Sequence, residues 1–374
     1  MEKFSFFSLS LFLFVSSAAA AGNIQAVFTF GDSIFDAGNN HFNPNCSIQA
    51  DFPPYGQSFF HHPTGRFTNG RTVTDFVSEL LGIELQKPYL EVEQEIAKGN
   101  LDKLYPQNGI NFASAGSGVL NDTNANFVSK SSNPFEAFFH FTKNELITIT
   151  TQLQQFESLV KQNKIEKRTI ERAFFFFESG SNDVFQYYFF SETDTDPKAY
   201  TEAMVEEAKR WLEQIYRLGA RRISVFGLGP VGCVPARMLF TNASADACHE
   251  EMNQMAQRYN LGLERLVMGM AKQYPGLHVT YGATFDTVMM LRAQPQRFGY
   301  SNVSSACCGE GTLGGMGQCG VGEYTVCDKP DEFLFWDFFH PTEHTYSLLT
   351  KAFWGGDQKR IRPMNLKTLA TTVY

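Results

Sequence analysis

Three side chains in this sequence have the types that acyl-transfer chemistry requires. Ser33 follows an apolar run at residues 26–30, and Asp337 and His340 stand three positions apart much later in the chain. A serine hydroxyl attacks an ester only when a base removes its proton, and a histidine acts as that base when an acceptor orients its other ring nitrogen. We therefore predict Ser33 as the nucleophile, His340 as the base that later returns the proton, and Asp337 as the acceptor.

The segments around these residues are suited to holding them. Residues 26–30 have the aromatic and β-branched composition of a buried parallel strand, and ligand sites of α/β sheets lie at the carboxyl ends of such strands. The alternative for this stretch is a strand followed by an ordinary Ser/Thr turn or a helix N-cap. The spacing of Asp337 and His340 lets both side chains face one way in a helical turn, and Pro341 restricts the backbone after it.

Two further polar stretches, residues 111–118 and 180–183, follow predicted strands. Together with residues 26–40 and 337–341, they resemble in order and spacing the four sequence blocks of the GDSL esterase/lipases, within the SGNH hydrolase superfamily. The resemblance covers essentially the whole mature chain, and the length, the leader and the late cysteines resemble the plant secreted branch. Ile34 occupies the leucine position of the family name, where we expect no effect on the chemistry.

The resemblance implies a three-layer α/β/α, flavodoxin-like fold with a five-stranded parallel sheet. It also implies a serine esterase or lipase that hydrolyses carboxylic (acyl) esters through an acyl-Ser33 intermediate, without a cofactor or metal. Three donors are predicted to converge on the oxyanion, namely the backbone N–H groups of Ser33 and Gly116 and the side-chain amide of Asn182. Each such donor contributes on the order of 3 kcal/mol to transition-state stabilisation.

Two alternatives stay open at this point. An acyltransferase with an alcohol acceptor would use the same Ser33, Asp337 and His340, so the sequence does not separate it from a hydrolase. A non-catalytic, glycosylated binding protein could keep the fold, although all the catalytic and oxyanion positions are filled. Among competing residues, Asp246 and His249 repeat the spacing of the predicted pair but lack a preceding apolar strand, and we interpret them as capping or surface residues.

Other polar features favour structural interpretations. Ser114 and Ser181 lie in glycine-containing turns, and no strict Gly-x-Ser-x-Gly elbow occurs, which argues against the α/β-hydrolase fold. The resemblance implies that the loop holding Arg66 and Arg71 frames the site, and we expect these two arginines to form structural ion pairs. The glycine-rich residues 227–233 lack the features of a phosphate-binding loop, so we predict a structural role for them.

Strands and helices are predicted to alternate along the chain, which is typical of a parallel sheet with helices on both faces. The predicted strands are residues 26–30, 111–113, 173–177, 222–226 and 277–281. The predicted helices begin near residues 72, 146, 196, 249 and 342. No linker or repeat divides the chain after the leader, so we expect a single hydrolase domain at residues 22–374. We interpret the leader, residues 1–21, as a signal peptide.

Composition limits the class of partner. The 374 residues carry a formal net charge of −8, which argues against nucleic acid, whereas a small-molecule or lipid ester fits the implied activity. The 37 phenylalanines fit either a Phe-packed core or an apolar acyl-binding groove. Apart from the leader, whose alternative is a membrane anchor, no segment is long and apolar enough to span a membrane. We expect a secreted protein, and the sequence leaves its oligomeric state open.

Cysteines and glycosylation sequons fit an oxidising, extracellular context. We expect Cys233 to pair with Cys248, the four late cysteines to pair among themselves in a connectivity that stays open, and Cys46 to be free. The late cysteines lack C-x-x-C spacing, which disfavours zinc. Candidate glycosylation sites are Asn45, Asn121, Asn242 and Asn302.

Overall fold

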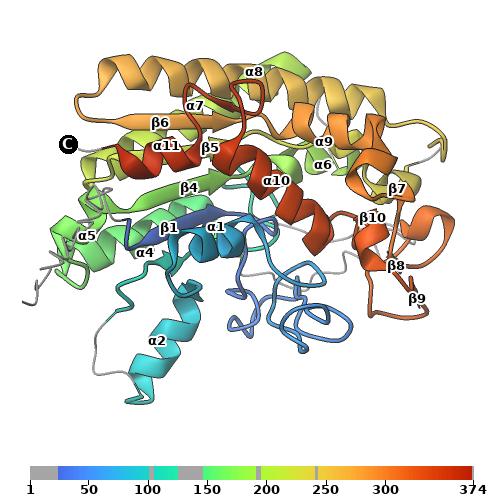
Figure 1. Cartoon of the computed structure of the whole chain (residues 1–374), viewed down its shortest axis with the longest axis horizontal. Coiled ribbons are helices and arrows are strands. Elements are labelled where there is room, and N and C mark those ends of the chain that lie inside the picture. The colour runs from blue at the N-terminus through green and yellow to red at the C-terminus, as the bar shows by residue number, and fades with distance from the viewer. Residues whose placement is uncertain (1–23, 101–104, 125–145, 191–194, 241–242, 373–374) are drawn as a thin grey trace, which may run out of the picture.

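The computed structural model describes residues 24–100, 105–124, 146–190, 195–240 and 243–372. At its centre is a seven-stranded sheet in the order β11-β6-β5-β4-β1-β3-β2 (Figure 1). All neighbouring strands in this sheet are parallel except β11 and β6. The strands are β1 (Val27–Gly31), β2 (Lys87–Pro88), β3 (Ile110–Asn111), β4 (Phe174–Glu178), β5 (Arg222–Phe226), β6 (His278–Gly282) and β11 (Ile361–Arg362).

The predicted three-layer α/β/α class is confirmed, but the sheet has more than the five predicted strands. The predicted strands correspond to β1, β3, β4, β5 and β6, whereas β2 and β11 add two residues each at the edges. Two-residue edge strands carry no hydrophobic run that a sequence pattern can reveal, and Pro88 in β2 is tolerated because an edge position needs fewer ladder bonds.

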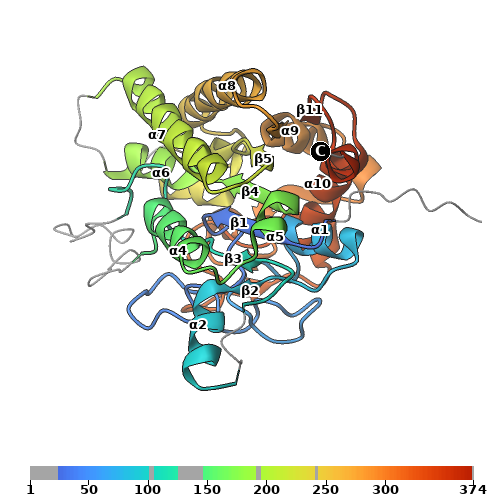
Figure 2. The same cartoon turned by 90° about the vertical axis from the view of Figure 1, so that its left-hand side faces the viewer.

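Helices cover both faces of the sheet, and Figure 2 shows α4 and α7 on one side and α1 and α10 on the other. The first layer packs α2 (Tyr89–Ala97), α4 (Ile149–Lys161), α5 (Lys167–Arg172), α6 (Ser181–Phe190), α7 (Pro197–Arg217) and α8 (Glu250–Gln273). The second layer packs α1 (Val73–Leu81), α9 (Thr284–Ala293), α10 (Glu343–Gly355) and α11 (Leu366–Thr371). Helices therefore occur near all five predicted starting points.

The phenylalanine run of β4 shows why this chain needs no alternation of polar and apolar residues. Phe175 and Phe177 pack into the core on the α7 and α8 side, whereas Phe174 and Phe176 pack on the α10 side. Both faces of a central parallel strand are buried, so every position can be apolar. The run ends at Glu178, which is also buried.

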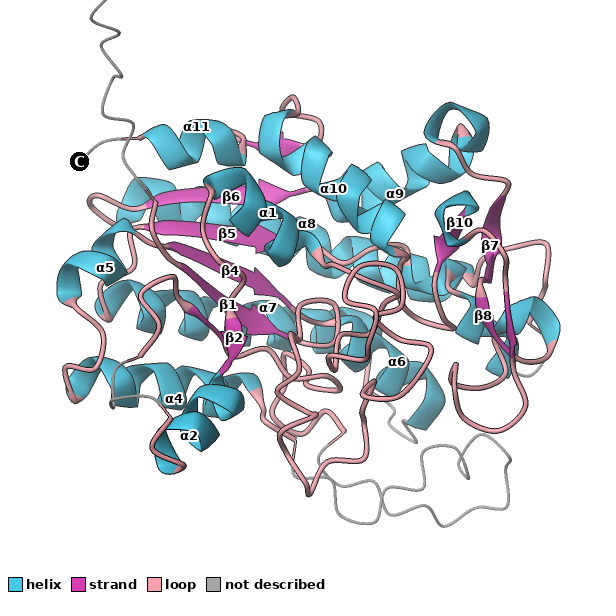
Figure 3. Cartoon of the chain, turned by 60° about the horizontal axis from the view of Figure 1, so that its bottom comes forward, coloured by secondary structure: helices cyan, strands magenta, loops and turns pink. Residues whose placement is uncertain are grey.

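The carboxyl ends of the central strands point toward a region rich in loops (Figure 3). This region also holds two small sheets, in which β7 (Asn302–Ala306) pairs with β10 (Phe333–Phe335) and β8 (Cys308–Gly309) pairs with β9 (Thr325–Val326). Three disulfides occur, and the expected pairing is confirmed, with the late cysteines joined as Cys307–Cys327 and Cys308–Cys319. Cys46 is free and buried.

Within the described ranges, no helix has the length and apolar character needed to cross a membrane. Across the same residues, no group of three or more His, Cys, Asp or Glu side chains is arranged to hold a metal ion. The predicted signal peptide at residues 1–21 and the sequon at Asn242 lie outside the described residues.

Candidate active site

The end of β1 places Ser33 at the rim of the sheet. Gly31 has a φ of +148°, and a Cβ there would lie 2.1 Å from the backbone oxygen of Glu178, so the close approach of β1 and β4 requires glycine. The next turn is tight, because Asp32 accepts hydrogen bonds at its backbone oxygen from Phe35 and Asp36 and at its side-chain Oδ1 from the Ile34 N–H. The half-buried Ser33 side chain therefore follows a strand end with little freedom to move.

His340 and Asp337 come from the segment between β10 and α10 and meet Ser33 directly. The Nε2 of His340 lies 2.8 Å from the Ser33 Oγ, and its Nδ1 lies 2.8 and 2.9 Å from the two Asp337 oxygens. Asp337 Oδ1 also accepts the backbone N–H groups of Phe339 and His340, which makes the predicted turn. The structure thus joins the three residues singled out from the sequence in one hydrogen-bonded chain.

Tyr55 belongs to the same chain, although the sequence reasoning missed it. Its hydroxyl donates a 2.7 Å hydrogen bond to Asp337 Oδ2, and its side chain is buried against Trp336. Burial, reinforced by the charge of Asp337, holds the pKa of Tyr55 well above its ordinary value, so this phenol stays a donor. The only sequence signal was its place between prolines and a glycine, which marks a turn rather than a site.

The loop that follows Tyr55 frames the site, as the family resemblance implied. The ring of Phe67 lies 5.0 Å from that of His340, and Thr68 donates to the backbone oxygen of Pro341. Arg66 and Arg71 form the expected ion pairs. Arg66 makes a buried bidentate pair with Asp75 in α1, and Arg71 joins Glu343 to Glu79, which ties the loop to the start of α10.

The three predicted oxyanion donors line the same cavity as the Ser33 hydroxyl. Gly116 has a φ of +85°, a left-handed conformation that favours glycine, and a Cβ there would also lie 2.5 Å from the side-chain Cδ1 of Ile48. The amide of Asn182 donates a 2.9 Å bond to the backbone oxygen of Ser117 and a long 3.5 Å bond to Asp32 Oδ2. Because the bond to Asp32 is long and weak, the amide N–H that makes it is available to donate to an oxyanion instead.

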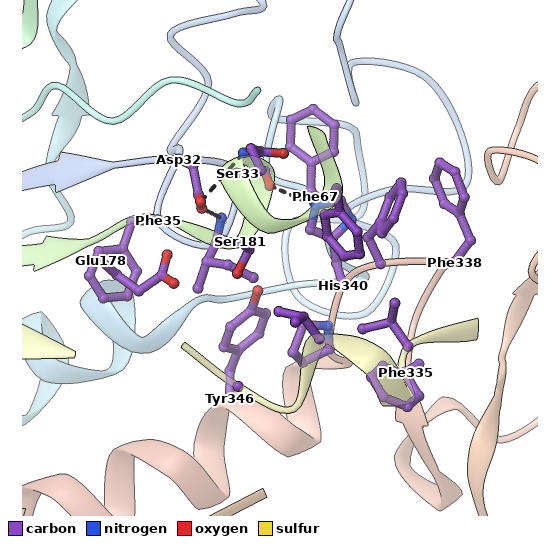
Figure 4. A pocket seen from close by; sticks show the side chains of 18 of the residues that line it. Asp32, Ser33, Phe35, Phe67, Glu178, Ser181, Phe335, Phe338, His340 and Tyr346 are labelled. Carbon is purple, nitrogen blue, oxygen red and sulfur yellow. Dashed lines mark hydrogen bonds between the residues drawn. The ribbon is translucent and has the colours of Figure 1, made fainter. Parts of the chain in front are cut away.

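The cavity beside Ser33 has a volume of about 440 Å³ and is lined mainly by apolar side chains. Figure 4 shows Phe67, Phe335, Phe338 and Tyr346 grouped with His340 around it. The cavity extends beneath the second helix layer, where Val288 of α9 and Leu349 of α10 line it. Phenylalanines therefore fill the core and also line the cavity beside Ser33, and the acyl-binding groove stays a prediction.

Gln152 of α4 also supports the candidate site, although no sequence motif predicted this role. Its side-chain oxygen accepts the Gly31 N–H at 3.0 Å, and its amide donates to the Gly31 backbone oxygen at 2.9 Å. This fully buried side chain thus binds both backbone groups of the residue two positions before Ser33. It fixes the strand end from which the turn to Ser33 departs.

Three buried aspartates near the site, Asp32, Asp36 and Asp183, accept hydrogen bonds from backbone N–H groups and so hold loops in place. Asp36 accepts the backbone N–H groups of Gly38, Asn39 and Ala115. Burial raises the pKa of Asp36 to about 6, because these hydrogen bonds offset only part of the lost hydration. Burial also raises the pKa of Asp183 to about 6, and Asp183 holds the backbone at Val119. The pKa of Asp32 likewise rises to about 6 through burial.

The competing residues lie elsewhere or lack partners of the right kind. His249 is the N-cap residue of α8, with its Nδ1 3.2 Å from Glu251, and among the described residues neither it nor Asp246 lines the cavity. Ser114 is buried and bonded to Asn40, whereas Ser181 does line the cavity. Ser181 is therefore the natural control for the role of Ser33.

Comparisons with known proteins agree with this geometry. A family model described as GDSL-like lipase/acylhydrolase matches residues 27–353. The chain belongs to the GDSL esterase/lipase family. It is 52% identical over 355 residues, 95% of this chain and 92% of the relative, to GDSL esterase/lipase 6 of Arabidopsis thaliana. It is 31% identical over 394 residues to GDSL esterase/lipase 5 of the same plant, with 99% and 95% of the two chains covered.

A GDSL lipase of Tanacetum cinerariifolium is 30% identical over 352 residues, 92% of this chain and 87% of the relative. The resemblance drawn from the four sequence blocks is therefore confirmed, and with it the class of activity. As a GDSL esterase/lipase, the protein is a carboxylic ester hydrolase of the SGNH type.

Proposed function

We propose that this GDSL esterase/lipase hydrolyses acyl esters with Ser33 as nucleophile, His340 as general base and acid, and Asp337 as the carboxylate that orients His340. The observation that carries this assignment is the hydrogen-bonded chain from Ser33 through His340 to Asp337, which opens on an apolar cavity. A nucleophile, a base and an orienting acceptor at hydrogen-bond distance are the arrangement that activates a serine.

The reaction has two halves. Ser33 Oγ attacks the acyl carbon while His340 Nε2 takes its proton, and the resulting oxyanion is held by the N–H groups of Ser33 and Gly116 and the amide of Asn182. The imidazolium then gives its proton to the departing alcohol oxygen, which leaves an acyl-Ser33 ester. Water attacks that ester with His340 as base, and the proton returns to Ser33 Oγ as the carboxylic acid departs.

A substrate with a hydrocarbon acyl chain fits this site best. The cavity of about 440 Å³ lies within the size range of small-molecule sites, and its lining is mainly aromatic and aliphatic. Burial of each methylene in such a lining contributes about 0.8 kcal/mol to binding. The acyl portion of the ester is therefore the part that the cavity selects.

We also propose that the protein is secreted, with residues 1–21 as a signal peptide and residues 22–374 as a single hydrolase domain. Three disulfides support an oxidising compartment. Asn45 and Asn121 are exposed and suit glycosylation, and Asn302 is half-buried in β7. Peptide mass mapping of the protein from a eukaryotic secretion host would test cleavage near residue 21 and glycans at these sites.

Labelling with a fluorophosphonate probe tests the nucleophile. We expect wild type and Ser181→Ala to be labelled and to hydrolyse p-nitrophenyl esters, and Ser33→Ala to do neither. Labelling that persists in Ser33→Ala would assign another nucleophile, and a folded wild type that fails to label would favour a binding protein. Product analysis with added alcohols would then measure how much acyl group goes to an acceptor other than water.

A further inference from the structure

Two acidic side chains at the site have no role in the reaction described above. Asp32 follows β1, Glu178 ends β4, and the two strands pair in parallel so that Gly31 lies opposite Glu178. Their side chains are 1% and 5% exposed, and both line the cavity. Figure 4 shows them on the side of the cavity from which Ser33 projects. Burying two carboxylates this close to a nucleophile is costly unless they share a proton.

The hydrogen bonds around the pair indicate where that proton lies. The carboxyl groups of Asp32 and Glu178 lie close enough for each to perturb the pKa of the other, and two ionised carboxylates side by side would repel and offer no donor to each other. Asp32 already accepts from the Ile34 N–H and, more weakly, from the Asn182 amide. The buried Oε2 of Glu178 has no partner among the donors of the described residues. A proton on Glu178 and a charge on Asp32 satisfy this arrangement.

The charge on Asp32 lies where the nucleophile needs support. It holds the backbone of Ile34 immediately after Ser33, and it interacts electrostatically with His340. A carboxylate at this point both fixes the turn and favours the imidazolium that forms when His340 takes the Ser33 proton. Its ionisation depends on donors, because burial works against the charge.

We propose that Glu178 is a positioning residue for ester hydrolysis, which donates the proton it shares with Asp32 and thereby keeps the Asp32 carboxylate charged and fixed against the turn that presents Ser33. This inference rests on the assignment of Ser33 as the nucleophile. Glu178 acts through Asp32 and touches neither the scissile bond nor His340.

The proposal has a consequence at alkaline pH. Among the described residues, the titratable groups that interact electrostatically with the pair include His340 from the loop before α10, Tyr259 from α8 and Tyr346 from α10. Burial and the charge of Asp32 raise the pKa of Glu178 well above its ordinary value, and burial raises the pKa of both tyrosines. When Glu178 finally ionises, the pair loses its shared proton, the two carboxylates repel each other, and the turn loses its support.

Two substitutions separate the two functions of the Glu178 side chain, namely donating a hydrogen bond and ionising at high pH. Glu178→Gln keeps an N–H donor for Asp32 but cannot ionise, and Glu178→Leu removes the donor with a similar volume. We expect Glu178→Gln to keep kcat within about threefold of wild type at neutral pH and to move the alkaline decline of kcat to higher pH. We expect Glu178→Leu to lower kcat roughly ten- to a hundredfold with little change in KM, which corresponds to losing a donor to a charged group.

Glu202→Gln on the exposed surface of α7 is the matched control and should behave as wild type. The proposal is overturned if Glu178→Gln loses as much activity as Glu178→Leu, if Glu178→Leu keeps the kcat of wild type, or if the alkaline decline is identical in wild type and Glu178→Gln. Thermal unfolding of each variant shows whether the protein is folded, and active-site titration with fluorophosphonate sets the concentration of working enzyme.

A measurement without turnover keeps this test separate from that of the nucleophile. The infrared spectrum of protein with isotope-labelled glutamate should contain, at neutral pH, the carbonyl band of a protonated carboxyl group that disappears in Glu178→Gln. Its absence in folded wild type would refute the shared proton even if Ser33 is the nucleophile. Its presence in Ser33→Ala would support the pair whatever residue attacks the ester.

Discussion

The hydroxyl of Tyr55 donates a 2.7 Å hydrogen bond to the Oδ2 of Asp337, although 282 positions separate the two residues in sequence. This bond completes the set of donors around Asp337, whose Oδ1 holds the backbone of its own turn. The orientation of the carboxylate toward His340 is therefore fixed from two sides. A residue from the first loop of the protein helps to set the geometry of a segment near its last strands.

Removing that donor should slow the reaction without weakening substrate binding. We expect Tyr55→Phe to lower kcat about tenfold, with KM within about twofold, because a hydrogen bond to a charged group typically contributes roughly 1.5–3 kcal/mol and other donors to Asp337 remain. Steady-state kinetics on a short p-nitrophenyl ester measures both values. Tyr324→Phe, at an exposed tyrosine, serves as the control. An unchanged kcat in Tyr55→Phe would show that the backbone donors alone orient Asp337.

The inner end of the cavity should set acyl length. Val288 of α9 lines it, so Val288→Phe should fill part of the space and lower kcat/KM for a p-nitrophenyl ester of about ten carbons more than tenfold, with little effect on the acetate. Met289→Phe, on the exposed side of the same helix, should leave both esters unaffected. Equal losses on the two esters would mean that the acyl chain lies elsewhere.

The Cys308–Cys319 disulfide should stabilise both the fold and the site. It closes a loop of 11 residues, for which chain entropy predicts about 3 kcal/mol. Cys308 also donates its N–H to the backbone oxygen of Trp336, next to Asp337. We expect Cys308→Ser with Cys319→Ser to lower the Tm by several degrees and to reduce kcat. Cys46→Ala, which removes the free thiol, should change each much less, and equal losses in the two proteins would contradict this account.

Buried Asp183 should make the protein more stable in mild acid than at neutral pH. Burial raises its folded-state pKa from 3.8 to about 6, so its contribution is fully present below pH 3.8 and is lost as the pH rises through about 6. This contribution is on the order of 3 kcal/mol. The free energy of unfolding should therefore depend less on pH, between about pH 4 and pH 6.5, in Asp183→Asn than in wild type or in a variant of exposed Asp328. An unchanged pH dependence in Asp183→Asn would refute this origin.

Most of the sheet, and the three side chains of the candidate site that the structure joins by hydrogen bonds, could be predicted because their signals are local. The apolar runs that become β1 and β4 are continuous in sequence, and each is followed by the polar residues that the carboxyl end of a strand presents. Asp337 and His340 lie within a single turn, so their spacing alone indicated a shared direction. The family resemblance became specific only because all four sequence blocks occur in the expected order, since each block alone is a weak signal.

Tyr55, Gln152 and Glu178 could not be assigned in the same way. Each acts through a contact with a residue far away in sequence, such as Gln152 with Gly31 across 121 positions, and such contacts leave no periodic pattern. A glutamate after four phenylalanines was visible in the sequence, but its burial and its neighbour Asp32 became apparent only once β1 and β4 were paired. The edge strands escaped prediction because two residues are too few for a pattern.

The distance along the chain between Ser33 and His340, 307 positions, has a consequence for the newly made protein. The Ser33 hydroxyl leaves the ribosome early, whereas His340 emerges only after β10. An incomplete chain therefore carries Ser33 without the base that would activate it. On the proposed assignment of Ser33 and His340, hydrolytic activity should therefore appear only when synthesis is almost complete. Stalled chains of increasing length should react with fluorophosphonate only after residue 340 has left the ribosome, and earlier reaction would show that Ser33 does not wait for its base.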